Sequence, residues 1–184
     1  MSIFGQTLAN YPTVAAIDPS LLDTGVAVLR SVRPGEMHRL VHAGLCQSTT
    51  RSDDLLAERC NVMVDQTKRL IGDVLFTNPH AVIIELPRIH AVTRGGKADP
   101  ADIIRLATLV GALAQFWTMQ GSIVRLIEPS EWKGQTPKDV TQRRCRAALD
   151  LAESPRVWLP SAASKAHNVW DAVGIALWSV GRYG

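Results

Sequence analysis

The chain has 184 residues, of which 46% are hydrophobic and 20% charged, and its formal net charge at pH 7 is +3. These values are ordinary for a globular protein, so we expect a single domain over residues 1–184. No apolar run is long enough to span a bilayer and no signal peptide is visible, so neither a membrane protein nor a secreted one is expected. Cys46, Cys60 and Cys145 are odd in number and form no CxxC pair, which argues against a disulfide framework or a zinc site and favours a reducing cytoplasm.

The chain begins with three predicted strands. Residues 13–18 (TVAAID) form a short apolar run that is typical of a buried strand. Residues 24–32 predict a second strand, and after the turn RPGE a third strand is predicted around residues 38–46. Because the connections between them are short, we expect these strands to form an antiparallel meander.

Helices and strands then alternate along the rest of the chain. Their predicted positions are a helix capped by Ser52, a strand over 81–85 (AVIIE), a helix opened by Asp99 and Pro100, a strand over 122–128 (SIVRLIE), a helix from the Thr136-Pro137 pair to about Leu151, and a helix over about 165–180. Apolar residues recur at helical spacing in the first two helices and predict their buried faces. These residues are Leu56, Cys60, Met63, Thr67, Leu70 and Val74, and then Ile103, Leu106, Val110, Leu113 and Trp117. The order predicts an α/β fold with a five-stranded mixed sheet, three strands antiparallel and then two parallel, flanked by helices.

Three acidic residues stand in apolar surroundings, where an unpaired charge costs several kcal/mol or more. Asp18 ends the first strand, Glu85 ends the fourth, and Asp171 lies within the helical stretch HNVWDAVGIALW. The first and fourth strands can lie side by side and parallel, about 4.8 Å apart, and open α/β sheets bind ligands at the carboxyl ends of their strands. Taken singly, each acid has a structural alternative as a turn, cap or solvent-facing residue. Taken together, the three predict one site for a divalent cation.

Two segments of the sequence are rich in basic residues. The first directly follows Glu85 and contains Arg88, His90, Arg94 and Lys97 without an acid, and the second contains Lys133, Lys138, Arg143, Arg144 and Arg146 against a single Asp139. This distribution favours an anionic polymer as partner, with a merely solvated surface as the alternative. Trp132 stands beside Lys133, and we expect its ring to hold that lysine in place.

Four segments together resemble the RuvC-type Holliday junction resolvases of the ribonuclease H-like superfamily, especially their short phage-type members. The segments are AAIDPSLLDTGVAVL, AVIIELPRIH, EPSEWKGQTPK and HNVWDAVGIALW, and with the order of elements they cover nearly the whole chain. Sugar-kinase and chaperone ATPases share a similar first segment, but the last helix and the WKG-x-x-PK segment favour the resolvases. The resemblance implies a ribonuclease H-like fold, a homodimer that binds four-way DNA junctions, and two symmetric nicks, each made with two Mg²⁺ or Mn²⁺ ions.

Carried over by position, the resemblance implies that Asp18, Glu85 and Asp171 are catalytic metal ligands. Asp18 would bridge both ions, Glu85 would hold one and Asp171 the other. The fourth ligand of the family is normally an Asp or His three residues before the last Asp. Here that position is Asn168, with His167 beside it on nearly the same helical face as Asp171, and either would complete the site.

The basic residues receive roles in the same way. Lys133 or Lys138 is expected near the scissile phosphate, where it would stabilise the developing charge. The DNA-binding residues implied are Arg88, His90, Arg94 and Lys97 at the mouth of the site, and Lys133, Lys138, Arg143 and Arg144 along the DNA arms.

The sequence therefore predicts a Mg²⁺- or Mn²⁺-dependent, structure-selective endodeoxyribonuclease that resolves Holliday or branched DNA junctions. It would act as a homodimer in the cytoplasm of a bacterial cell or a phage-infected host, without a nucleotide cofactor. One alternative is another ribonuclease H-like nuclease that acts on RNA or RNA–DNA hybrids. A second is a catalytically weak junction-binding protein, which the neutral Asn168 motivates. A third, an ATP-binding domain of the sugar-kinase type, needs paired domains for which the chain is too short.

Overall fold

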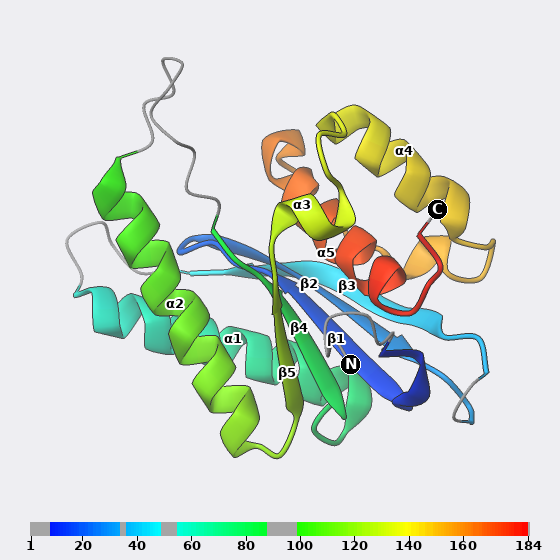
Figure 1. Ribbon diagram of the computed structural model, residues 1–184, viewed down its shortest axis with the longest axis horizontal. Helices are drawn as coiled ribbons and strands as arrows, with labels where there is room; N and C mark the ends of the chain where they lie inside the picture. Colours follow the sequence, from blue (N-terminus) through cyan, green and yellow to red (C-terminus); the bar gives the residue numbers. More distant parts are fainter. Residues whose placement is uncertain (1–7, 34–35, 49–54, 88–98, 184) are drawn as a thin grey trace.

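The structure, a computed structural model, describes residues 8–33, 36–48, 55–87 and 99–183 and is built on a five-stranded mixed sheet (Figure 1). The strands are β1 (Thr13–Asp18), β2 (Asp23–Arg30), β3 (Arg39–Gln47), β4 (Ala81–Glu85) and β5 (Ile123–Ile127). Their order in the sheet is β3-β2-β1-β4-β5. The β1–β2 and β2–β3 pairs are antiparallel, whereas β4 is parallel to both β1 and β5. The predicted topology, with its antiparallel meander followed by parallel strands, is confirmed.

Helices cover both faces of the sheet, as Figure 1 shows. The helices are α1 (Leu56–Leu75), α2 (Pro100–Met119), the short α3 (Pro129–Trp132), α4 (Lys138–Ala148) and α5 (Ala166–Ser179), with 3-10 turns η2 (Leu8–Asn10), η3 (Ser154–Arg156) and η4 (Ala163–Lys165). Alternate residues of the strands feed two separate cores. One core lies against α1 and α2, and the other lies against α5, with α3 and α4 beside it. None of the helices in these ranges is long and apolar enough to cross a membrane.

The buried face of α1 departs from the predicted one toward its end. Leu70 and Val74, expected inside, are only partly buried, whereas Ile71 and Leu75 are buried. The predicted stripe alternates steps of four and three residues, whereas the buried residues advance by four from Met63 to Leu75, so the buried face turns gradually around the helix. The predicted cap, Ser52, lies outside the described residues.

The start of α2 agrees with the prediction, but its first turns are less buried than expected. Asp99 is the N-cap, and its side chain accepts a hydrogen bond from the main-chain N–H of Ala101. Ile103 and Leu106, both expected in the core, are only partly buried because they line open pockets beside the sheet edge. The buried part of α2 begins at Leu109.

The boundaries of α4 also differ from the predicted ones. Pro137 is the N-cap and Lys138 the first helical residue, so Thr136 is not the cap. The carbonyl of Pro137 accepts the first intrahelical hydrogen bond, which is the role of an N-cap residue. The helix ends at Ala148, three residues before the predicted Leu151.

The start of α5 lies directly against β2 because β2 carries a glycine there. Gly25 pairs with Asp18 across the sheet, and a Cβ added to Gly25 would overlap the main-chain carbonyl of Asn168. The absence of a side chain therefore lets the first turn of α5 approach the end of β1. This close approach sets the position of Asp171, which lies one turn further along the same helix.

Candidate active site

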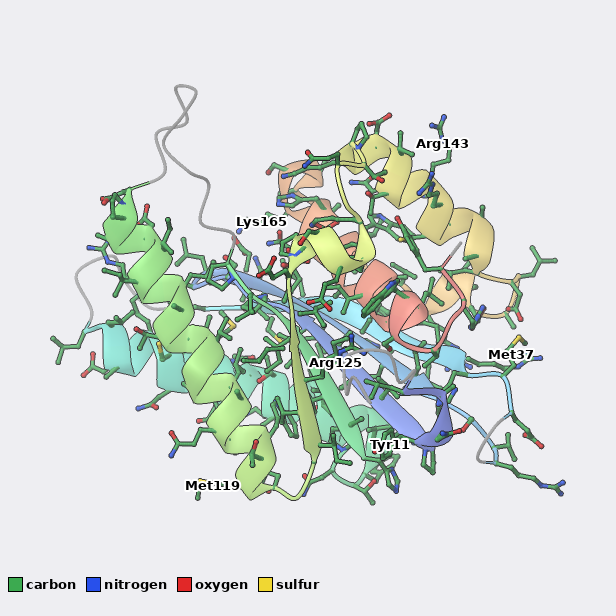
Figure 2. All side chains as sticks on the ribbon, viewed as in Figure 1. Tyr11, Met37, Met119, Arg125, Arg143 and Lys165 are labelled. Atoms are coloured by element: carbon green, nitrogen blue, oxygen red, sulfur yellow. The ribbon has the colours of Figure 1, made fainter. Side chains whose placement is uncertain are left out.

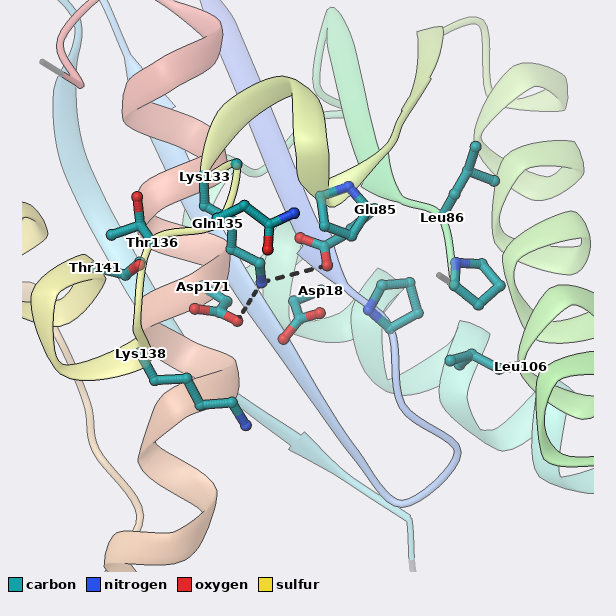
Figure 3. Close-up of a pocket in the computed structure, with 14 residues that line it drawn as sticks. Asp18, Glu85, Leu86, Leu106, Lys133, Gln135, Thr136, Lys138, Thr141 and Asp171 are labelled. Carbon is teal, nitrogen blue, oxygen red and sulfur yellow. Dashed lines mark hydrogen bonds and ion pairs between the residues drawn. The ribbon is translucent and has the colours of Figure 1, made fainter. Parts of the chain in front are cut away.

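Three carboxylates from three different elements meet in one pocket (Figure 3). Asp18 ends β1, Glu85 ends β4, and Asp171 projects from α5. The pocket has a volume of about 370 Å³ and is also lined by Lys133 and Lys138. The three acids that the sequence predicted at one site are thus brought together by the fold.

The register of the sheet explains why two of these acids are neighbours. Strands β1 and β4 are adjacent and parallel, and Ile17 pairs with Ile84. The next residue of each strand, Asp18 and Glu85, therefore emerges at the same carboxyl edge of the sheet. Ligand sites of open α/β sheets lie at this edge. The apolar residues that precede each acid are packed in the two cores, so neither acid can move out of the pocket without disturbing that packing.

The ammonium group of Lys133 lies between two of the carboxylates. Its Nζ is 2.8 Å from Oδ2 of Asp171 and 3.4 Å from Oε1 of Glu85. Burial disfavours the charged ammonium, but the charges of Glu85 and Asp171 outweigh this effect and raise the pKa of Lys133 above its ordinary value. Lys133 is therefore held as a cation inside an anionic pocket.

The pocket holds three carboxylates against the ammonium groups of Lys133 and Lys138. Burial, followed by repulsion from Glu85 and Asp171, raises the pKa of Asp18 well above its ordinary value. Burial also raises the pKa of Glu85, against the opposing effects of Lys133 and the indole of Trp132. Burial is thus the main cause of both pKa shifts, and for Asp18 the charges of the two neighbouring carboxylates add to it.

These residues fit a hard divalent cation by the chemistry of their donors. Carboxylate oxygens are the ligands that Mg²⁺ and Mn²⁺ prefer, and the surplus negative charge of the pocket calls for a cation. As the side chains stand, no group of three or more His, Cys, Asp or Glu within the described residues is arranged to hold a metal ion. The ammonium of Lys133 occupies the space between Glu85 and Asp171, so a cation bound there would require this lysine to move aside.

Asn168 and His167, the two residues predicted to complete the site, do not line the pocket. The side-chain amide of Asn168 donates a hydrogen bond to the main-chain carbonyl of Asp23 at the start of β2. The His167 Nδ1 atom is 2.6 Å from the carbonyl oxygen of Ser164. Asn168 is thus bound to the start of β2 and His167 to η4, and neither contacts the three carboxylates through these hydrogen bonds.

Trp132 is the residue of the site whose role the sequence showed only in part. Its ring lies under the ammonium of Lys133, with 4.7 Å between Nζ and the ring centroid, so the expected contact with Lys133 is present. The indole Nε1 also donates a 2.7 Å hydrogen bond to Oε2 of Glu85, which the sequence did not indicate. The two residues are far apart in the chain, and no local pattern connects them.

The predicted DNA-binding residues fall into three groups. Lys133 and Lys138 line the pocket, and Arg143 and Arg144 are exposed on α4. Figure 2 shows Arg143 pointing outward from α4, away from the sheet. The predicted residues that lie outside the described residues are Arg88, His90, Arg94 and Lys97.

Comparison with known proteins gives a consistent picture of the fold. No family model matches the chain, and no curated protein matches it. Among solved structures, Thermus thermophilus RuvC in complex with a Holliday junction substrate superimposes with a TM-score of 0.65 and 22% identity, over 93% of each chain. The yeast mitochondrial Holliday junction resolvase gives 0.62 and 11%, over 98% of this chain and 81% of its own. Fowlpox virus resolvase with substrate Holliday junction DNA gives 0.54 and 12%, over 92% and 97%. The chain therefore has the ribonuclease H-like fold of the RuvC-type Holliday junction resolvases, as its motifs predict.

Proposed function

We propose that this chain is a divalent-cation-dependent endonuclease that nicks Holliday or other branched DNA junctions. The observation that carries the proposal is the convergence of Asp18, Glu85 and Asp171 on one pocket. This pocket lies at the carboxyl edge of a sheet whose fold is shared with a RuvC solved on a Holliday junction substrate. A fold alone does not assign an activity, so it is the site that supports the proposal.

Asp18, Glu85 and Asp171 are the residues that would hold Mg²⁺ or Mn²⁺, two ions per site as the family resemblance implies. When bound, such ions supply an activated water and neutralise the charge on the leaving 3′ oxygen. Asp18 interacts electrostatically with both other carboxylates, which suits the bridging position proposed for it. Asn168 and His167 remain the candidates for a fourth ligand, and either would have to leave its present hydrogen bond to reach the pocket.

Two lysines supply the positive charge that a phosphodiester substrate needs. Lys133 and Lys138 line the same pocket as the three carboxylates. Once the DNA backbone lies in the pocket, their ammonium groups would stabilise the charge that develops on the scissile phosphate. Helix α4 begins at Lys138 and carries the exposed Arg143 and Arg144, so positive charge continues outward from the pocket toward a DNA arm.

Symmetric nicking of a junction requires two copies of the site related by a two-fold axis, so the proposal includes a homodimer. An apolar groove of about 570 Å³ lies between α2 and the edge strand β5 and shares Leu86, Pro87 and Pro129 with the wall of the site. Leu126 of β5, which lines the groove, and Ile104 near the start of α2 are exposed. Apolar surface of this kind supports the assignment of the α2 side to the contact between two copies.

Two observations favour a second candidate, a junction-binding protein with little or no cleavage activity. The amide of Asn168 is bound to the Asp23 carbonyl rather than directed to the pocket. The ammonium of Lys133 also lies where a divalent cation would sit. Such a protein would bind junctions with normal affinity in every metal yet leave the strands intact.

The proposed function is tested by replacing each carboxylate with its neutral amide. Asp18→Asn, Glu85→Gln and Asp171→Asn should each slow the nicking of a labelled four-way junction by about 100- to 1,000-fold, because a metal supplies several kcal/mol of transition-state stabilisation. Junction binding in EDTA should be retained by all three variants. Asp139→Asn, an exposed acid in the first turn of α4, is the matched control and should cut at the wild-type rate. Wild-type cutting by Asp18→Asn would refute the assignment of the pocket as the active site.

A further inference from the structure

Trp132 is a buried residue of the pocket wall that contacts two charged groups of the site. It ends the short helix α3, and only 5% of its surface is exposed. Its Nε1 donates to Oε2 of Glu85 at 2.7 Å, and the Lys133 ammonium stands over its ring at 4.7 Å. One side chain thus contacts both the carboxylate proposed as a ligand and the lysine proposed to face the phosphate.

The surroundings of Trp132 fix its ring in this orientation. Helix α5 passes directly beneath it at Gly174, where an added Cβ would overlap the edge of the indole. Tyr183 packs edge-on against the ring, with 5.7 Å between the centroids. A capping box formed by Glu128 and Glu131 holds the start of α3. The indole is therefore supported from several sides and cannot easily turn its N–H away from Glu85.

The hydrogen bond divides the two oxygens of the Glu85 carboxylate between two tasks. Oε2 accepts from the indole, whereas Oε1 faces the pocket, 3.4 Å from the Lys133 ammonium. A hydrogen bond from an N–H group to an ionised carboxylate is stronger than a hydrogen bond between two neutral groups. Such a bond orients a ligating carboxylate in the way that outer partners of metal ligands generally do.

We propose that Trp132 is a positioning residue, which locks Glu85 so that one oxygen alone is presented to a divalent cation and which aligns Lys133 beside it. The inference rests on the proposed metal-dependent function of the pocket. Trp132 itself touches neither the cation nor the substrate in this scheme and acts through Glu85. It would explain why a tryptophan stands directly before the lysine of the site.

The variant Trp132→Phe tests the inference, because it keeps an aromatic ring under Lys133 and removes the N–H. Calorimetric titration with Mn²⁺ alone should show affinity lowered by about 10- to 100-fold, the usual cost of removing an outer partner of a metal ligand. The maximal nicking rate should fall in parallel, while the junction concentration for half-maximal binding stays unchanged.

Trp117→Phe is the matched control. Trp117 is 1% exposed on the other side of the sheet, and its indole N–H has no hydrogen-bond partner among the described residues. This variant should bind Mn²⁺ and cut junctions as the wild type does. Equal Mn²⁺ affinity in Trp132→Phe and the wild type would overturn the inference.

A double-mutant cycle shows whether Trp132 acts through Glu85. In a Glu85→Gln background, Trp132→Phe should lower Mn²⁺ affinity no further, and an additive loss would contradict the proposal.

If Trp132→Phe does not fold, the wild-type protein can be tested instead, with the NMR resonance of the Trp132 indole N–H as the readout. That resonance should shift on saturation with Mg²⁺ and the Trp117 resonance should not, and an unmoved Trp132 resonance would overturn the inference. Because these readouts use the metal alone, a protein that binds Mn²⁺ but never cuts junctions would refute the proposed function and leave the role of Trp132 standing.

Discussion

Two kinds of buried carboxylate occur in this molecule, and they differ in how completely they are paired. Glu153 is 2% exposed, and its two oxygens receive hydrogen bonds from both terminal nitrogens of Arg182, at 2.6 and 2.7 Å, and from the main-chain N–H groups of Leu40 and Asp150. Asp18 and Glu85 share a pocket with Asp171, where three carboxylates face two lysines and burial raises the pKa of both Asp18 and Glu85. The first pattern is that of a structural ion pair, and the second is that of a site prepared for a cation.

The pairing of Glu153 predicts an acid-sensitive contribution to stability. Burial alone would raise its pKa, but the hydrogen bonds from Arg182 and the main chain outweigh burial and lower it to about 2, against 4.5 for an ordinary glutamate. The stabilisation is therefore complete above about pH 4.5 and is lost as the pH falls toward about 2. Glu153→Gln should lower the free energy of unfolding at neutral pH by about 3 kcal/mol and should flatten its decline in acid. Urea unfolding at several pH values measures both effects.

Glu36→Gln serves as the control for this prediction, because Glu36 is exposed and paired only loosely with Arg33, at 3.9 Å. It should leave the free energy of unfolding nearly unchanged. An acid decline as steep in Glu153→Gln as in the wild type would show that this carboxylate is not the group that titrates.

At the residue level, the sequence revealed acids in apolar runs but not their partners. Asp18, Glu85 and Asp171 could be predicted because apolar neighbours made their burial visible. The hydrogen bond from Trp132 to Glu85 could not, because it joins residues 47 positions apart through the tertiary fold. Glu153 gave no signal at all, since it stands in a mixed polar segment and its partner lies near the end of the chain.

At the level of elements, the strands were easier to predict than the ends and faces of the helices. AVIIE is β4 as predicted, and β1 has the predicted residues 13–18, because each is an apolar run flanked by polar residues. The start of helix α4 was misplaced because Thr136 and Pro137 each suit a helix start and local chemistry does not choose between them, and its end was placed three residues too late.

The contact between α5 and β2 gives a prediction for Gly25. In Gly25→Ala, the new Cβ would overlap the carbonyl of Asn168, a main-chain group that cannot rotate away. The variant should lose about 1–3 kcal/mol of unfolding free energy and should nick junctions more slowly, because a displaced α5 moves Asp171 relative to Asp18. Thermal unfolding and junction nicking measure the two effects.

Gly72→Ala provides the comparison for Gly25→Ala. Gly72 lies in α1 with nothing within 4 Å of an added Cβ, so this variant should gain up to about 1 kcal/mol from higher helix propensity and should cut normally. If Gly25→Ala were as stable and active as the wild type, the close approach of α5 would not be what positions the site.

At the level of the whole molecule, the distribution of charge matters more than the net charge of +3. Helix α4 lies on the same side of the sheet as α3 and α5, so its exposed arginines continue from the pocket (Figure 1). Fold and topology could be predicted from the sequence because the order of elements and four motifs agreed with one another. The path of a DNA arm and the contact between two copies could not, because both depend on a partner that the chain's own packing does not encode.

The basic surface of α4 is tested by the double variant Arg143→Ala/Arg144→Ala. It should bind a four-way junction more weakly in EDTA, and the slope of log affinity against log salt should become shallower by about 1 for each phosphate that an arginine neutralises in the wild type. Lys68→Ala/Arg69→Ala removes the same charge from exposed positions on α1, on the opposite face of the sheet, and should leave the slope unchanged. Equal slopes in the two double variants would show that α4 does not bind the DNA backbone.

Gel cleavage of a labelled four-way junction beside a linear duplex and an RNA–DNA hybrid, each with Mg²⁺, Mn²⁺ or EDTA, tests whether the pocket is the site of a metal-dependent junction nuclease. The three carboxylates around the pocket predict nicks on the junction, paired on opposite strands, that appear with either metal and disappear in EDTA. Binding of the junction without cleavage in any metal would contradict a nuclease activity and favour the junction-binding protein. Cleavage of the hybrid in preference to the junction would contradict a junction nuclease and would indicate a different ribonuclease H-like nuclease.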